Sequence, residues 1–266
     1  MAKLKRLKPS AWKTTYTPTF KDRHIEAAWL DEHWGYGGRI HEVAAEAITS
    51  ALRKPSSRAE GHALYFKLFA EVGNALEVAG ALGWVIRTRR DHPLLLDAFL
   101  TYPTSAPRDF YKAVRRNRSG SLIQLLKLPA EAKVVAALAT SPDLEWTEDE
   151  ARLTLTDGVR HARFLADRHL GDDEIIRSTY NRAKHGATML HDASLPVQQF
   201  YVIAPHLEIR GARDKARYDM PKFTVNRGMV QGLEKSVAAA GAMIRYLSGL
   251  AKALNEAGLL YQVRRP

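Results

Sequence analysis

The sequence predicts a mainly α-helical protein, a helical bundle with long amphipathic helices and a small β-hairpin insertion. Apolar residues recur at helical spacing over long stretches, and between Val230 and Leu254 their steps alternate between three and four residues. A different pattern, rich in β-branched and aromatic residues, occupies about residues 197–226, where the polar run ARDKARYDMP separates two apolar segments. We therefore expect one hairpin within an otherwise helical chain.

The composition is that of a globular, basic protein. Of the 266 residues, 45% are hydrophobic and 26% are charged, as in chains that bury a core. The absence of cysteine excludes disulfide bonds, thiolate metal ligands and a thiol nucleophile. The net charge of +11 favours polyanionic partners, because each neutralised phosphate releases counterions. We expect RNA as a partner, although basic side chains also serve solubility alone.

Residues 1–20 are interpreted as a basic arm, and residues 21–266 as a single helical domain that carries the hairpin insertion. The arm contains Pro9 and Pro18 and lacks helical periodicity. It is basic but has no apolar core of the kind found in signal peptides, and we identify no apolar run long enough to cross a bilayer. These features predict a cytoplasmic protein with no membrane partner.

The domain opens with helices of increasing length. The first covers about residues 23–34 and ends at the loop WGYGG, and the second starts at Ile40, presents one apolar face and ends at KPSSR. Ser57 and Glu60 match a capping box at the start of a long third helix that ends before Pro93. Glycines within this helix indicate close packing against a neighbour: Gly73, Gly80 and Gly83.

Shorter helices interrupted by prolines are expected over residues 93–140. Thr147 and Glu150 form a second capping box, which opens a helix that runs to about His169. A short helix follows at about residues 174–185, and Gly186 has the position and residue type that end a helix.

The stretch YNRAKHG gathers polar and cationic side chains at the end of that short helix. Arg177, Asn181 and His185 recur every four residues and share one face, with Arg182 at its edge and Lys184 on another side. A histidine, an arginine and an orienting amide are sufficient for RNA cleavage without a metal. The histidine handles the protons of the 2′-hydroxyl and the leaving 5′-oxygen, while the arginine stabilises the phosphorane. The alternative is a solvated, well-capped helix end.

The motif, set in an all-helical chain, resembles the motif helix of HEPN-like proteins (higher eukaryotes and prokaryotes nucleotide-binding). The resemblance implies a helical bundle, often dimeric, and for many members metal-independent RNase activity in toxin–antitoxin or phage-defence systems. Their motif is an arginine, commonly followed by a polar residue, with a histidine a short spacer later. Asn181 and His185 match the polar position and the histidine, whereas Tyr180 occupies the arginine position. Arg177 lies too far from the histidine for the family spacing and Arg182 too close.

Arginines elsewhere are candidates for phosphate contacts. The run PRDFYKAVRRNR alternates aromatic and basic residues, so Phe110 and Tyr111 could stack on bases while the arginines hold phosphates. The alternative is an amphipathic helix whose aromatic side chains face the core. With Lys184, the predicted nucleic-acid-binding residues are Arg87, Arg89, Arg90, Arg115, Arg116 and Arg118.

No cofactor and no metal site is predicted. The chain lacks a phosphate-binding loop and a serine-hydrolase motif, and its histidines lack the spacing of a metal site. Glu71 and Asn74 would either support the catalytic residues or line a solvated face of the long helix.

Two hypotheses follow. The first is a HEPN-like RNA-binding protein acting as a metal-independent endoribonuclease in a defence or toxin setting. His185 would be the acid and base, Asn181 the orienting amide, and Arg177 or Arg182 the cation. The second is a catalytically inactive binding or scaffold protein of the same fold, in which Tyr180 marks the loss of activity. In either case the apolar seam of the C-terminal helix, residues 230–254, is a candidate surface for a homodimer.

Overall fold

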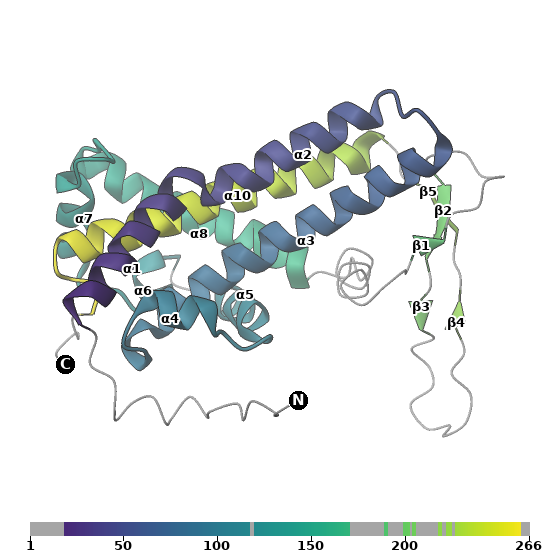
Figure 1. The fold of residues 1–266 in the computed structure, drawn as a ribbon. Helices are drawn as coiled ribbons and strands as arrows, with labels where there is room; N and C mark the ends of the chain where they lie inside the picture. The colour runs from purple at the N-terminus through teal and green to yellow at the C-terminus, as the bar shows by residue number, and fades with distance from the viewer. Residues whose placement is uncertain are drawn as a thin grey trace, which may run out of the picture. The chain divides into compact units, whose positions relative to one another are not determined.

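The computed structural model describes residues 19–117, 120–170 and 227–261, together with the backbone of short strands between residues 189 and 224 (Figure 1). The described chain is mainly helical, which confirms the predicted fold class at this level. It separates into two compact units, which are described in turn. The first unit contains described residues up to Gly38, Val78–Phe164 and those from Ala242 onward, and the second contains Arg39–Glu77 and described residues of Leu165–Gly241.

The first unit begins with α1 (Phe20–Glu32), whose start is set by a capping box. The Thr19 hydroxyl accepts from the Asp22 backbone N–H at 3.3 Å, and the Asp22 carboxylate accepts from the Thr19 backbone N–H at 2.8 Å. A π-helical turn, η2 (His33–Gly37), follows directly and leads into α2 (Gly38–Leu52). The prediction of a loop at WGYGG is therefore wrong. The glycines lower the helix propensity of this stretch, but the backbone continues from α1 to α2 as a helix.

Helix α3 (Arg58–Thr88) contributes to both units. One half of the predicted capping box is present at its start, where the Ser57 hydroxyl accepts from the Glu60 backbone N–H at 3.1 Å. The Glu60 carboxylate instead accepts from the hydroxyl of Ser56, at 2.5 Å. The apolar side chains that recur at helical spacing along α3 form a buried stripe, among them Leu68, Val72, Leu76, Leu82 and Ile86.

The helical stretch Arg58–Asp91 is long and apolar enough to cross a membrane, with a window of mean hydropathy 1.2. This corrects the expectation that no segment reaches that length. However, 67% of the window is buried inside the protein, as in the core helix of a soluble protein, so the finding is weak evidence for a span.

Short helices fill the middle of the first unit, as the prolines predict. After the 3₁₀ turn η3 (Arg89–Asp91) come α4 (Leu95–Leu100), α5 (Ala106–Arg116), α6 (Leu122–Leu125) and α7 (Glu131–Thr140). The next helix, α8 (Glu148–Leu170), starts at the predicted capping box. The Glu150 carboxylate accepts from the Thr147 hydroxyl at 2.8 Å, and the Thr147 hydroxyl accepts from the Glu150 backbone N–H at 3.3 Å.

The C-terminal helix, α10 (Arg227–Glu256), also contributes to both units. Its predicted seam is core: Leu233 is 4% exposed, Val237 is 1% exposed, and Ile244, Leu247 and Leu254 are fully buried. The seam from Leu233 onward is therefore covered within one chain and does not offer the homodimer surface expected of it. Dimerisation itself stays a prediction.

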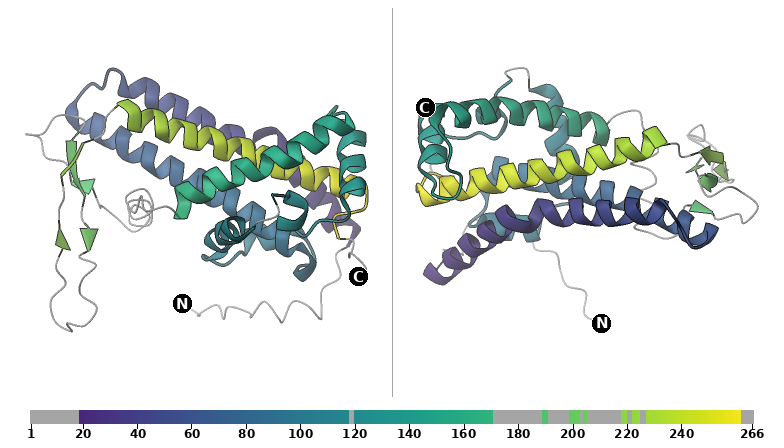
Figure 2. Two further views of the ribbon diagram at one scale, coloured as in Figure 1. Left: turned by 180° about the vertical axis from the view of Figure 1, so that it is seen from behind. Right: turned by 90° about the horizontal axis from the view of Figure 1, so that it is seen from above.

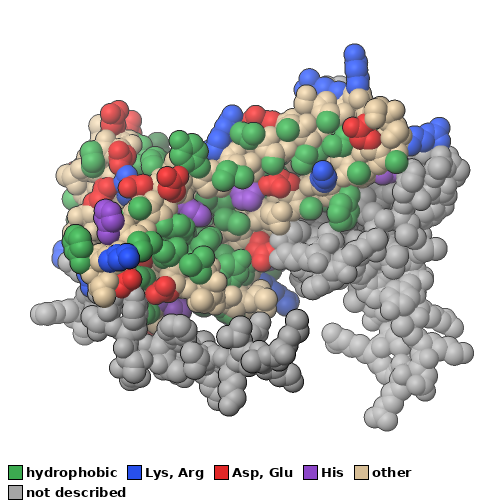
Figure 3. Space-filling view, in the orientation of Figure 1, with side chains coloured by type: hydrophobic (Ala, Val, Ile, Leu, Met, Phe, Trp, Pro, Cys, Tyr) green, Lys and Arg blue, Asp and Glu red, His purple; other side chains and the backbone are tan. Residues whose placement is uncertain are grey.

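In the second unit, α2 and the N-terminal parts of α3 and α10 lie side by side (Figures 1 and 2). The His41 Nδ1 and the Glu71 Oε1 lie 2.5 Å apart and join α2 to α3. The inward face of α2 carries Ala45 and Thr49, whereas Ile40 is 63% exposed and Val43 is 48% exposed. The apolar face predicted for α2 is thus partly a surface face, and hydrophobic side chains appear over α2 in Figure 3.

Short antiparallel strands follow α8 in sequence. β1 (Met189–Leu190) pairs with β2 (Gln199–Val202), which pairs with β5 (Lys222–Thr224), and β3 (Ala204–Pro205) pairs with β4 (Tyr218–Asp219). Much of the segment predicted as a hairpin lies outside the described residues, so the hairpin insertion stays a prediction.

Candidate nucleic-acid interface

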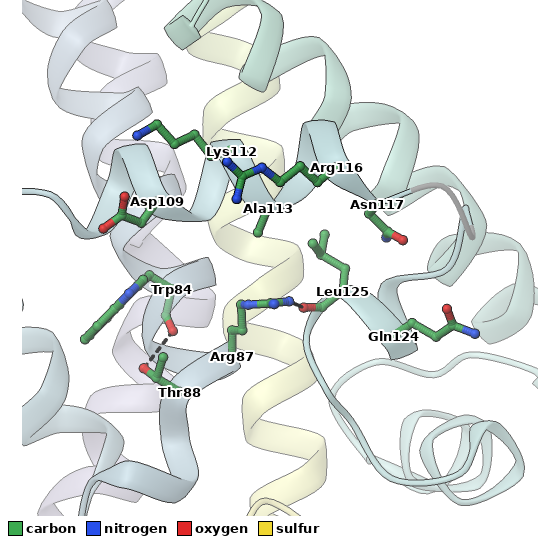
Figure 4. Close-up of a pocket in the computed structure, with 10 residues that line it drawn as sticks. All are labelled: Trp84, Arg87, Thr88, Asp109, Lys112, Ala113, Arg116, Asn117, Gln124 and Leu125. Carbon is green, nitrogen blue, oxygen red and sulfur yellow. Dashed lines mark hydrogen bonds between the residues drawn. The ribbon is translucent and has the colours of Figure 1, made fainter.

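A hollow with a basic lining lies between α3, α5 and α6 in the first unit (Figure 4). Its volume is about 610 Å³, which is within the range of sites for nucleotide-sized ligands. We call it the basic hollow. Its lining residues are Trp84, Arg87, Thr88, Asp109, Lys112, Ala113, Arg116, Asn117, Gln124 and Leu125.

The close packing of α5 on α3 forms the hollow and depends on two glycines of α3. A Cβ at Gly80 would lie 2.7 Å from the Tyr111 ring, and a Cβ at Gly83 would collide with the Phe110 ring. The close packing predicted from these glycines is therefore present, with α5 as the neighbour. Phe110 is 1% exposed and Tyr111 is fully buried, so they anchor α5 and do not present their rings for base stacking.

With its aromatic face buried against α3, α5 turns a polar face outward. Lys112 and Arg116 are four residues apart and lie on one side of that face, above the hollow in Figure 4. Arg87 reaches into the hollow from α3 and donates from Nη1 to the backbone carbonyl of Leu125. Partial burial lowers the pKa of Arg87, but an arginine still carries its charge at neutral pH. Three cations from two helices therefore face one space.

The rest of the lining is polar with one flat aromatic side chain. Among the described lining residues, Asp109 is the acid, while Asn117, Gln124 and Thr88 offer amide and hydroxyl groups. Trp84 lies at one end of the hollow, with its ring centroid 5.7 Å from that of His92. Cations in excess of acid suit a phosphodiester backbone, and an indole and amides suit a base or ribose.

Arg89 has a different role from the one the sequence suggested. It is fully buried, and its guanidinium donates to four backbone carbonyls: those of Leu260 at 2.5 Å, Ile86 at 2.9 Å, Leu126 at 2.9 Å and Lys127 at 2.8 Å. Burial, with the charge of Arg90 beside it, lowers the pKa of Arg89 to about 10. The expectation that Arg89 binds nucleic acid is therefore corrected, because its side chain is fully buried and its guanidinium bonds to backbone carbonyls of the protein.

Of the other arginines predicted to bind nucleic acid, some line the basic hollow and others do not. Arg116 and Arg87 line the basic hollow, whereas Arg90 and Arg115 are exposed outside its lining. Arg118 lies outside the described residues. Lys112 was missed by the sequence reasoning, although its spacing of four residues from Arg116 could have indicated it.

The motif residues, Arg177, Asn181, Arg182, Lys184 and His185, all lie outside the described residues, so their roles stay predictions. Glu71 pairs with His41, and Asn74 is exposed on α3. Within the described part of the chain, no group of three or more His, Asp or Glu side chains could hold a metal ion.

Comparison with protein-family models, with curated proteins and with solved structures gives no match for this chain. The sequence and the geometry of the basic hollow are therefore the observations that bear on function.

Proposed function

We propose that this chain is a HEPN-like RNA-binding protein of the cytoplasm. One observation carries the proposal: Arg87, Lys112 and Arg116 face a single hollow in which Asp109 is the acid among the described lining residues. The net charge of +11 gives the same preference for a polyanion at the scale of the chain. The HEPN-like assignment rests on the resemblance of the YNRAKHG stretch, and so does a role in defence or toxin systems.

In this proposal the RNA is also cleaved, without a metal, at the motif helix. His185 takes the proton from the ribose 2′-hydroxyl, whose oxygen attacks the phosphorus. The bond to the 5′-oxygen breaks, a proton is returned to that oxygen, and the products are a 2′,3′-cyclic phosphate and a free 5′-hydroxyl. Arg177 or Arg182 stabilises the negative phosphorane, and Asn181 orients the histidine or the phosphate.

Cleavage of a labelled single-stranded RNA in EDTA tests the enzymatic part. The wild type should cleave, and His185→Ala should lose at least about a hundredfold in rate, the usual range for removing a general acid or base. His24→Ala, an exposed histidine of α1, is the matched control and should retain full activity. Equal activity in wild type and His185→Ala, or no activity in either, would remove His185 from the mechanism.

A non-enzymatic function is the second candidate, and Tyr180 is the observation that favours it, because it stands where HEPN-like nucleases carry arginine. An inactive binding or scaffold protein would retain RNA affinity at the basic hollow but show no cleavage in EDTA or with divalent metals.

A homodimer is proposed for both candidates, and light scattering should give about twice the monomer mass of 29.8 kDa.

We also propose that residues 197–226 form a β-hairpin insertion. The antiparallel pairing of Phe200 with Phe223 and of Pro205 with Tyr218 supports it, since both pairs bring the two ends of that segment together.

A further inference from the structure

A second cavity in the first unit, distinct from the basic hollow, lies between α8, α10 and the π-helical turn η2. Its volume is about 340 Å³, enough for a ligand of one or two fused rings. Two tryptophans, Trp34 and Trp146, line it together with Leu153 and Met243, and we call it the aromatic cleft. Leu153 is 63% exposed, a large apolar side chain left at the surface of α8.

Local departures from regular helix packing form this cleft. The π-helical turn carries Trp34, and π turns of this kind are frequent at functional sites. Trp34 packs over Gly249 of α10, where a Cβ would lie 2.6 Å from the indole ring. On the other wall, a Cβ at Gly158 of α8 would lie 2.9 Å from the Tyr246 ring. The two aromatic walls therefore require glycine on the helices that they face.

Tyr246 contributes a polar group that lacks a partner. Its hydroxyl is buried and has no hydrogen bond to any described residue, although buried hydroxyls normally have one. Burial raises the pKa of Tyr246, so the hydroxyl remains protonated at neutral pH, and Tyr246 contributes its ring to the wall of the cleft.

The charges at the cleft favour an acidic ligand. Arg245 is the arginine among the described lining residues, and Asp157 is the acid among them. The Asp157 carboxylate already pairs with Arg160, at 3.1 Å, which reduces its repulsion of an anion. The lining thus combines apolar and aromatic side chains with the guanidinium of Arg245.

We propose that the aromatic cleft binds a small planar aromatic molecule that carries one acidic group, such as an aromatic carboxylate. The ring lies between the tryptophans and Met243, and the acidic group lies at Arg245. This site is independent of the RNA-binding function proposed above, because the two cavities share no lining residue.

Isothermal titration calorimetry of the full-length protein with 1-naphthoate and with its neutral analogue 1-naphthamide tests the proposal. The wild type should bind the carboxylate about tenfold more tightly than the amide, a difference of about 1.4 kcal/mol. Arg245→Met should bind both probes equally, because it keeps the apolar stem and removes the charge. Trp146→Ala should weaken both probes, because it removes an indole ring from the lining.

Leu100→Ser is the matched control, since Leu100 is 72% exposed outside the cleft lining, and it should bind both probes as the wild type does. The proposal is overturned if the wild type binds neither probe, or if Arg245→Met keeps the preference for the carboxylate. It is also overturned if Leu100→Ser loses as much affinity as Trp146→Ala, because binding would then be general surface adsorption.

Discussion

Arg89 shows how one residue type can serve the core or the surface. Ile86 follows Leu82 by four residues, and Arg89 follows Ile86 by three, so Arg89 extends the buried face of α3 beyond the end of the helix. Its side chain is fully buried. Its guanidinium satisfies carbonyls at the end of α6, where the helix leaves its last carbonyls without partners. The periodicity that predicted the helix could have predicted this burial, but three arginines within the four residues RTRR favoured a surface interpretation.

Replacing Arg89 by methionine should therefore destabilise the protein strongly. The substitution leaves four buried or partly buried carbonyls without their donors, and we expect a loss of about 3–5 kcal/mol in the free energy of unfolding. Urea denaturation followed by circular dichroism measures it. Arg53→Met, at an exposed position after α2, should change stability by less than about 0.5 kcal/mol. Equal effects of the two substitutions would contradict a structural role for Arg89.

Glu26 predicts a pH dependence of stability. Its carboxylate is 2% exposed and accepts hydrogen bonds from the Tyr261 hydroxyl at 2.7 Å and the Leu96 backbone N–H at 3.1 Å. Burial outweighs these bonds and raises the pKa of Glu26 above its ordinary value of 4.5. The folded state thus binds the proton more tightly than the unfolded state does. This contribution to stability is complete below pH 4.5 and is lost as the pH rises through the raised pKa.

Glu26→Gln removes that titration. Between pH 4.5 and pH 7, the stability of the variant relative to the wild type should rise, as measured by urea denaturation at several pH values. Glu131→Gln, at an exposed position of α7, serves as the control and should show no such trend. A relative stability of Glu26→Gln that is flat or falls with pH would show that Glu26 is not protonated more readily in the folded state.

At the scale of elements, the packing of α5 against α3 positions the basic hollow. Gly83→Ala should push Phe110 outward and destabilise the protein by about 1–3 kcal/mol, as overpacked cores do. The same change should weaken RNA binding, because Lys112 and Arg116 lie on the displaced helix. Thermal denaturation and RNA titration measure the two effects.

Gly232→Ala provides the matched control within another long helix. Nothing lies within 4 Å of a Cβ at Gly232, so helix propensity alone should act and raise stability by up to about 1 kcal/mol. If Gly83→Ala is also stabilising, the close approach of α3 and α5 is not a constraint in the protein.

The elements that the sequence predicted well are those with strong local signals. Thr147 and Glu150 define the start of α8 by hydrogen bonds within one turn, and the step pattern of α10 matches its buried side chains. The π-helical turn could not be predicted, because glycines in WGYGG are equally typical of a loop and the choice depends on contacts elsewhere. The basic hollow needs residues from α3, α5 and α6, so local spacing could indicate Lys112 and Arg116 together but not their position opposite Arg87.

At the scale of the whole molecule, the excess of cations predicts RNA affinity that falls with salt. General charge and a specific site make different predictions for single residues. If net charge alone attracts RNA, any two exposed cations are equivalent. If the basic hollow is the site, Lys112 and Arg116 matter far more than cations elsewhere.

The most direct measurement is the affinity for a fluorescent single-stranded RNA over a range of salt concentrations. Lys112→Ala/Arg116→Ala is compared with Lys133→Ala/Arg152→Ala, a double variant that removes the same charge from exposed positions of α7 and α8. We predict that the first variant binds at least about tenfold more weakly, with a log–log salt slope smaller by roughly 1.4, and that the second binds nearly as the wild type does. Equal losses in the two variants, or no loss in the first, would contradict RNA binding at the basic hollow.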